Sequence, residues 1–97
     1  MVNKNKYGEW ETLTKEQKDL LDETIIKYLP TKLKGINSKV SSYGLKHKFE
    51  EILGFYISNL DMKEAMARLG YKNNGDKQNQ YYNISSREIN ELNKILR

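Results

Sequence analysis

The sequence predicts a single domain, residues 1–97, that is mainly α-helical with a small β-hairpin and resembles a winged helix-turn-helix in layout. Apolar residues recur at helical spacing in four stretches, each preceded by a serine or threonine that can cap a helix. A turn sequence, Asn74-Gly75-Asp76, lies between two short segments able to pair as strands. The chain is long enough to bury one hydrophobic core.

The first helix is expected over residues 12–29. Thr14 and Gln17 have the spacing of a capping box, in which each side chain accepts a hydrogen bond from a free amide of the first turn. Pro30 ends the helix because it has no N–H to donate. The residues before this helix, 1–11, are predicted to form a partly ordered lead-in.

The second helix is expected over residues 41–53. It begins after Ser41 or Ser42, either of which can cap it, and Gly54 suits the left-handed conformation that commonly ends a helix. The following residues, 55–57, are aromatic or β-branched, so they predict a brief extended segment.

Ser58 and Asp61 repeat the capping-box spacing and predict a third helix over 58–69. A hairpin over 71–84 follows. The extended segment before the third helix can pair with this hairpin, which gives a small three-stranded sheet of the winged-helix kind.

Ser85 and Glu88 predict the start of a final helix over 86–97, with Ile89 and Leu92 facing inward. The alternative to the winged arrangement is a generic helical domain in which residues 72–80 form a frayed loop.

Composition excludes several classes of protein. The chain has no cysteine, which rules out disulfides and thiolate metal sites, and no apolar run long enough to cross a bilayer. The N-terminus lacks the apolar core of a signal peptide, so we expect a cytoplasmic protein. The one histidine, His47, has no partner with which to bind zinc or activate a nucleophile. We therefore expect no enzyme activity, no cofactor and no small-molecule substrate.

Positive charge is concentrated in the middle of the chain. The net charge is +4, and residues 30–49 contain five lysines and no acidic residue. Such a block suits an anionic partner such as DNA. Solvated lysines in a connecting loop are the alternative interpretation.

The basic block lies beside the expected start of the second helix. The free amides and the positive end of the helix dipole would then lie near Ser42, Lys46 and His47, where they could bind a phosphate. An ordinary capped helix explains the same residues equally well. The residues predicted to contact nucleic acid are Lys39, Ser41, Ser42, Tyr43, Lys46, His47, Lys48, Asn59, Lys63, Arg68, Lys72 and Lys77.

The third helix would enter the major groove in a helix-turn-helix protein. Among its outward positions, Asn59 and Arg68 suit base edges, but Asp61 and Glu64 would approach phosphates unfavourably. The expected binding is therefore salt-sensitive and weak in sequence preference, to single- or double-stranded DNA.

Two sequence stretches carry a resemblance to a known family: S-S-Y-G-L-K-H-K-F-E at 41–50 and G-F-Y-I-S-N-L-D-M-K-E-A-M-A-R-L-G-Y at 54–71, with Y-Y-N-I at 81–84. Together they resemble short, mostly uncharacterised proteins of bacterial mobile genetic elements, over roughly residues 37–85. The resemblance extends to the small protein encoded between a family-A polymerase and a helicase in staphylococcal cassette chromosomes. The residues to which this resemblance points are Ser42, Tyr43, Lys46, His47, Ser58 and Asn59.

The resemblance implies a role in replication or mobility. Combined with the basic block, it predicts a non-enzymatic accessory protein that contacts DNA and assists a replication enzyme, either a polymerase or a primase. One alternative is a protein-interaction module, such as a phage-type inhibitor, that does not contact DNA. Another is a winged-helix transcriptional regulator, which would need a dimer to read two half-sites. None of these interpretations includes a membrane.

Overall fold

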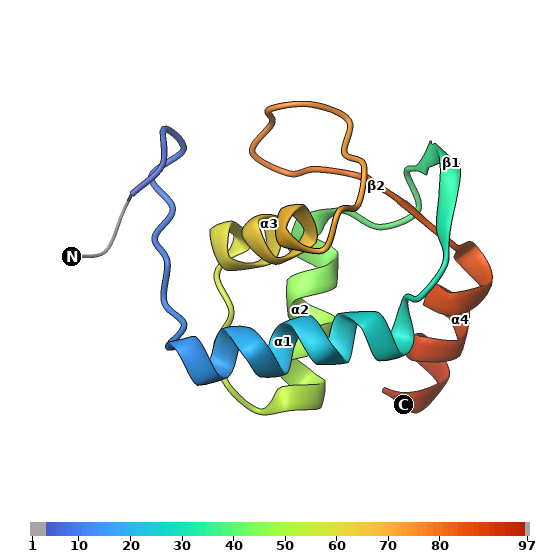
Figure 1. The fold of residues 1–97 in the computed structure, drawn as a ribbon, viewed down its shortest axis with the longest axis horizontal. Helices are drawn as coiled ribbons and strands as arrows, with labels where there is room; N and C mark the ends of the chain where they lie inside the picture. The colour runs from blue at the N-terminus through green and yellow to red at the C-terminus, as the bar shows by residue number, and fades with distance from the viewer. Residues whose placement is uncertain (1–3, 97) are drawn as a thin grey trace.

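The structure, a computed structural model, describes residues 4–96; the expected parts of the lead-in at 1–3 and of the last helix at 97 lie outside this range. The described chain is mainly helical with a small antiparallel sheet and has a winged helix-turn-helix layout (Figure 1). The elements in chain order are α1 (Lys15–Tyr28), β1 (Lys32–Asn37), α2 (Ser42–Leu53), α3 (Asn59–Arg68), β2 (Tyr82–Ile84) and α4 (Ser86–Ile95).

The expected helix starts are confirmed by local hydrogen bonds. Thr14 and Gln17 form the capping box of α1, and Ser58 and Asp61 form that of α3. The Ser85 hydroxyl caps α4 by accepting from a backbone N–H of the first turn. These helices therefore begin where short-range sequence signals predict, because a cap needs only residues three positions apart.

The two-stranded sheet joins distant parts of the chain. β1 pairs antiparallel with β2, with Lys32 opposite Ile84 and Asn37 opposite Tyr82, and an irregularity lies between these pairs. On the other side of β2, Asn73 bridges Tyr82. The predicted hairpin is therefore present, and the loop between its arms, residues 75–80, forms the wing above α3 in Figure 1.

One predicted strand was wrong. Residues 55–57 do not pair with the sheet. The strand that pairs with β2 is β1, which lies in the basic block, where no strand was predicted. Gly54, with φ at 78°, turns the chain immediately after α2. The backbone N–H of Ile57 then donates to the Glu50 carboxylate at 2.9 Å, which holds this segment against α2 instead of the sheet.

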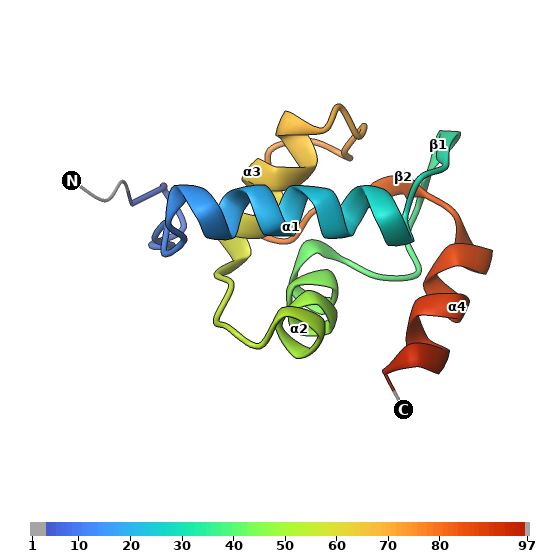
Figure 2. The ribbon, with the colours of Figure 1, turned by 60° about the horizontal axis from the view of Figure 1, so that its bottom comes forward.

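The helices enclose one core beneath the sheet. Figure 2 shows α1 running between α2 and α3, with α4 at the far end of α1. The Tyr71 hydroxyl donates to the carbonyl of Leu29 and joins the hairpin to the end of α1, and burial raises the pKa of Tyr71 to about 12. Within residues 4–96, none of the helices combines the length and the apolar character needed to cross a membrane. The buried apolar residues are Leu21, Ile25, Leu29, Leu45, Phe49, Ile57, Met62, Ala65, Met66, Tyr71, Tyr82, Ile84, Ile89 and Leu92.

Candidate functional site

The start of α2 is tied to the wing. Ser41 is the N-cap, and its hydroxyl accepts from the Gly44 N–H. Ser42 is fully buried; its backbone N–H donates to the Gln80 carbonyl at 2.7 Å and its hydroxyl accepts from the Gln80 N–H at 3.1 Å. The Ser42 hydroxyl therefore serves an internal contact. Its expected role at a phosphate was wrong, because its position beside the wing leaves no exposed surface.

Lys46 is also buried, which corrects its expected place in an exposed basic patch. It is 5% exposed, and its Nζ lies 3.3 Å from Glu50 Oε2. The same ammonium lies over the rings of Tyr43 and Tyr56, 5.5 and 4.9 Å from their centroids. Its charge is thus balanced by Glu50 and screened from solvent by two aromatic faces.

Glu50 connects three of these groups. Besides Lys46, its carboxylate accepts from the Ile57 N–H and lies 3.0 Å from Nδ1 of His47. Burial acts to raise the pKa of Glu50, but the Ile57 N–H and Lys46 outweigh burial, so the pKa is lowered. His47 is exposed and packs edge-on against Tyr43.

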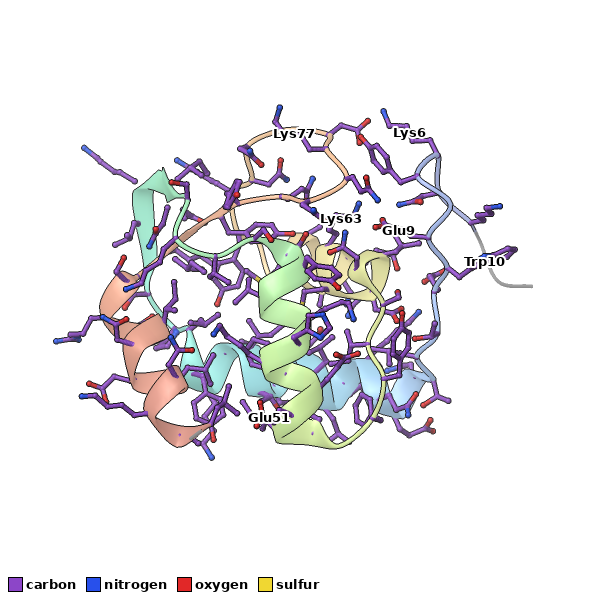
Figure 3. All side chains as sticks on the ribbon, turned by 180° about the vertical axis from the view of Figure 1, so that it is seen from behind. Lys6, Glu9, Trp10, Glu51, Lys63 and Lys77 are labelled. Atoms are coloured by element: carbon purple, nitrogen blue, oxygen red, sulfur yellow. The ribbon has the colours of Figure 1, made fainter. Side chains whose placement is uncertain are left out.

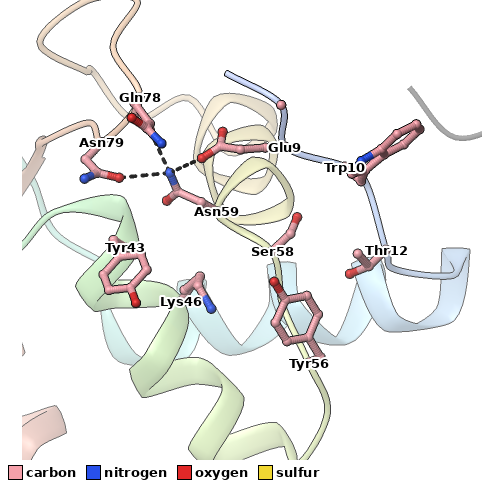
Figure 4. A pocket seen from close by; sticks show the side chains of 11 residues that line it. Glu9, Trp10, Thr12, Tyr43, Lys46, Tyr56, Ser58, Asn59, Gln78 and Asn79 are labelled. Carbon is pink, nitrogen blue, oxygen red and sulfur yellow. Dashed lines mark hydrogen bonds between the residues drawn. The ribbon is translucent and has the colours of Figure 1, made fainter. Parts of the chain in front are cut away.

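A cavity of about 500 Å³ opens where the starts of α2 and α3 meet (Figure 4). Its walls include three exposed aromatic rings: those of Trp10, Tyr43 and Tyr56. The side chains in Figure 4 come from the N-terminal segment, both helices, the turn between them and the wing. The lining residues are Gly8, Glu9, Trp10, Thr12, Tyr43, Lys46, Tyr56, Ser58, Asn59, Gln78 and Asn79.

Asn59 lies at the inner end of this cavity and is 7% exposed. Its Nδ2 donates to Glu9 Oε2 at 2.7 Å, to the Gln78 carbonyl at 2.6 Å and to Asn79 Oδ1 at 3.0 Å. Its Oδ1 is buried and has no hydrogen-bond partner among the described residues. In Figure 4 this oxygen points away from the three acceptors, toward the side where Tyr43 lies.

Residues 4–12, here called the N-terminal segment, cover the first turns of α3. Glu9 forms an ion pair with Lys63 at 2.9 Å, and the Asp61 carboxylate accepts from the Thr12 N–H at 3.0 Å. Figure 3 shows Glu9 and Lys63 close together beside the upper end of α2. The expected outward positions Asn59, Asp61 and Lys63 are consequently buried, so the prediction that α3 presents Asn59 and Lys63 to the major groove of a duplex was wrong.

The C-terminal half of α3 is engaged as well. Arg68 forms two hydrogen bonds with the Asp22 carboxylate of α1, at 3.0 and 2.8 Å, so its charge is paired within the domain. Burial, followed by a hydrogen bond with Glu11, raises the pKa of Glu64 to about 7. Below this pH the protonated Glu64 carboxyl donates a hydrogen bond to Glu11, which links α3 to the N-terminal segment.

Unlike Lys46 and Lys63, several other lysines are not paired with a carboxylate and could bind a phosphate. Lys39 Nζ donates to Asn90 Oδ1 of α4 at 2.7 Å, and Lys48 Nζ donates to Asn93 Oδ1, also on α4. These two side chains, here called the α4-facing lysines, form no ion pair with a carboxylate within residues 4–96. The same is true of four exposed lysines on β1 and in the hairpin, which are Lys32, Lys34, Lys72 and Lys77.

No family model, curated protein or solved structure matches this chain. Within the part of the chain that the structure describes, no three histidine, aspartate or glutamate side chains lie together as a metal site would require.

Six of the predicted residues lie in two places. Tyr43, Lys46, Ser58 and Asn59 line the cavity, whereas Lys39, before α2, and Lys48, on α2, point toward α4. The sequence did not identify Glu9, Trp10 and Tyr56 as site residues. Tyr56 was assigned to a strand, and the lead-in gave no sign that it folds back over α3, 49 residues away in the chain.

Proposed function

We propose that this chain is a non-enzymatic accessory protein of a mobile genetic element and contacts the DNA backbone through the α4-facing lysines, Lys39 and Lys48. The observation that carries the proposal is the pairing of both ammonium groups with asparagine oxygens of α4. A neutral amide orients an ammonium group without cancelling its charge. The two lysines therefore keep their attraction for phosphate while their positions are fixed.

The surrounding surface supports this proposal. Lys32 and Lys34 are exposed on β1, and Lys72 and Lys77 are exposed in the hairpin. Four of the five lysines in residues 30–49 form no ion pair with a described carboxylate; Lys46 is the exception. The acid-free sequence block therefore retains most of its charge after folding.

The N-terminal segment covers the first turns of α3, which favours DNA binding with weak sequence preference. Phosphate contacts position a protein on DNA, whereas base contacts in the groove carry the sequence information. The N-terminal segment occupies the first turns of α3, and Arg68 is held by Asp22. A protein that binds the backbone fits this arrangement better than a sequence-reading transcriptional regulator.

The partner enzyme follows from the sequence resemblance. The stretches at 41–50 and 54–71 resemble small mobile-element proteins, which implies assistance to a polymerase or a primase. Co-purification of this chain with such an enzyme after nuclease treatment supports a direct contact between the proteins. Loss of the enzyme on nuclease treatment indicates that DNA bridges the two.

The backbone contact is tested by the double substitution Lys39→Glu/Lys48→Glu. Binding to single-stranded and duplex oligonucleotides is measured by fluorescence anisotropy over a range of salt concentrations. Loss of two phosphate contacts reduces the slope of log K against log salt by about 1.4 for single strands and about 1.8 for duplex. The expected result is weaker binding with this reduced slope.

The control is Lys15→Glu/Lys27→Glu on α1, which changes the net charge by the same amount. If both double variants bind equally well, only overall charge matters and the α4-facing lysines are not the contact. Undetectable binding of the unmodified chain at low salt contradicts the proposed function itself.

A further inference from the structure

The side-chain oxygen of Asn59, Oδ1, is a buried acceptor without a hydrogen-bond donor among the described residues. All three partners of its Nδ2 are oxygen acceptors, so the orientation of the amide is fixed and its Oδ1 faces elsewhere. Buried acceptors in folded proteins nearly always have a partner, because an unsatisfied one loses hydration without compensation. Oδ1 has none among the described residues. A ligand in the cavity that carries an N–H group would supply it.

Lys46 adds a donor to the same cavity. Its ammonium group carries three protons, and one of them is engaged by Glu50. Because Glu50 balances the charge, the cavity does not attract a bare phosphate as an exposed lysine would. It instead suits an uncharged ligand that has both an acceptor for Lys46 and a donor for Asn59.

The walls of the cavity favour a flat ligand. Trp10, Tyr43 and Tyr56 are 48%, 50% and 62% exposed, although aromatic side chains of this size usually bury most of their surface. Such exposed rings can stack on a planar group. The volume of about 500 Å³ is in the range of small-ligand sites and admits a single heterocycle with its sugar.

Nucleobases combine these properties. Each base has a π-face that stacks on aromatic side chains and an edge on which donors and acceptors lie side by side. We infer that this cavity binds one unpaired base of a single-stranded nucleic acid, stacked on Tyr43 or Tyr56 and hydrogen-bonded to Asn59 and Lys46. The inference rests on the proposed function and adds to it a preference for single strands.

The route into the cavity is compatible with a strand. Asn59 Oδ1 is covered in the free chain, so a base reaches it only after a side chain that lines the cavity turns aside. Lys77 directly precedes the lining residues Gln78 and Asn79 and is exposed at the top of Figure 3. A phosphate next to the bound base would lie on this side.

Trp10 provides a direct readout. It is the single tryptophan of the chain and lines the cavity, so its fluorescence reports on occupation of this site. The probes are cytidine, a short single-stranded oligonucleotide, and an abasic oligonucleotide of the same length. We expect cytidine and the normal oligonucleotide to change Trp10 emission, and the normal oligonucleotide to bind about tenfold or more tightly than the abasic one.

The stacking contact is tested by Tyr43→Leu and Tyr56→Leu. Both side chains are exposed, so the fold should persist, and circular dichroism checks that it does. The matched controls are Tyr43→Phe and Tyr56→Phe, which keep the ring. We expect the Leu variants together to remove the advantage of the normal over the abasic oligonucleotide, while the Phe variants retain it.

The outcomes separate this inference from the proposed function. Equal, salt-sensitive binding of normal and abasic oligonucleotides overturns the base site and leaves the backbone contact intact. A response of Trp10 to cytidine without any binding of the abasic oligonucleotide supports the base site and contradicts the backbone contact. A response of Trp10 to N-acetyltyrosinamide but not to cytidine overturns the inference in favour of a site for an aromatic side chain of a protein.

Discussion

Lys46 and Lys63 differ from the other lysines because folding buries each against a carboxylate, leaving them 5% and 9% exposed. A buried ion pair of this kind gains little net stability, since the attraction between its members is offset by their loss of hydration. Each pair instead fixes the position of the side chains around it. Lys46 is held between two tyrosines, and Lys63 holds Glu9 over α3.

A pH dependence of stability is predicted at Glu64. Burial, followed by a hydrogen bond with Glu11, raises its pKa from 4.5 to about 7. Between these values the folded chain keeps a proton that the unfolded chain has released, so the free energy of unfolding falls as the pH rises through this window. Glu64→Gln keeps a donor toward Glu11 but does not titrate. We expect the wild-type chain to lose about 1 kcal/mol relative to this variant between about pH 5 and about pH 8.

Urea denaturation at the two pH values measures this difference. Glu23→Gln, on the exposed side of α1, is the matched control and should follow the wild-type chain at both pH values. Parallel behaviour of Glu64→Gln and the wild-type chain would show that Glu64 is ionised in the folded state.

Among the elements, α2 contains an unusual glycine in its first turn. Gly44→Ala should favour the helix by about 1 kcal/mol through propensity alone. Here, however, the added Cβ would lie 2.5 Å from Cγ2 of Val40, a stiff β-branched side chain. We expect Gly44→Ala to lower the free energy of unfolding by about 1–2 kcal/mol.

A double-mutant cycle with Val40→Ala tests the clash. In that background the obstructing methyl group is gone, so Gly44→Ala should become stabilising, as measured by urea denaturation. A loss of the same size in both backgrounds would show that contact with Val40 is not the reason for glycine at this position.

The helices were predictable from the sequence because their signals are local. The Thr14 and Ser58 capping boxes use residues three positions apart, and Gly54 ends α2 by its own backbone conformation. β1 was missed because its pairing depends on β2, about 50 residues away, and its sequence mixes lysines with a glycine. The aromatic segment at 55–57 has the composition of a strand, but Gly54 turns the chain before it and Glu50 binds the Ile57 N–H, so it does not pair with the sheet.

The candidate site was predictable only in part. Tyr43, Lys46 and Asn59 were identified, but as surface residues facing DNA, since a sequence pattern cannot show that Lys46 is covered by Tyr56 or Asn59 by the wing. The spacing of Lys46 and Glu50, four residues apart on one helix, was the available signal for their ion pair.

At the scale of the whole molecule, the N-terminal segment is an integral part of the domain. It reaches the wing through Lys6 and the Tyr7 hydroxyl, both of which contact Asp76, and it reaches α3 through Glu9. The segment therefore joins two parts of the winged fold that have no sequence proximity to it.

Deleting residues 1–10 should destabilise the domain without unfolding it. The deletion leaves Lys63 without its carboxylate and Asn59 without one of its acceptors. We expect the thermal midpoint to fall by about 10 °C, which corresponds to a loss of about 2 kcal/mol for a domain of this size. Differential scanning calorimetry measures the change.

Glu9→Gln serves as the companion variant, because it removes the charge opposite Lys63 while the segment stays in place. It should reproduce much of the loss caused by the deletion. An unchanged thermal midpoint in the truncated chain would mean that the segment rests on the surface without stabilising it.

β1 pairs with β2 along one side only, which leaves its other side as an open edge in the described chain. Open edges invite a second copy to add a strand and start aggregation, and Leu33 and Ile36 are exposed there as well. Lys32 and Lys34 counter this tendency by like-charge repulsion between copies. Acetylation of these two amines, or their neutralisation by a dense polyanion, would therefore promote self-assembly through this edge, and concentrated preparations should remain dispersed best when the lysines are fully charged.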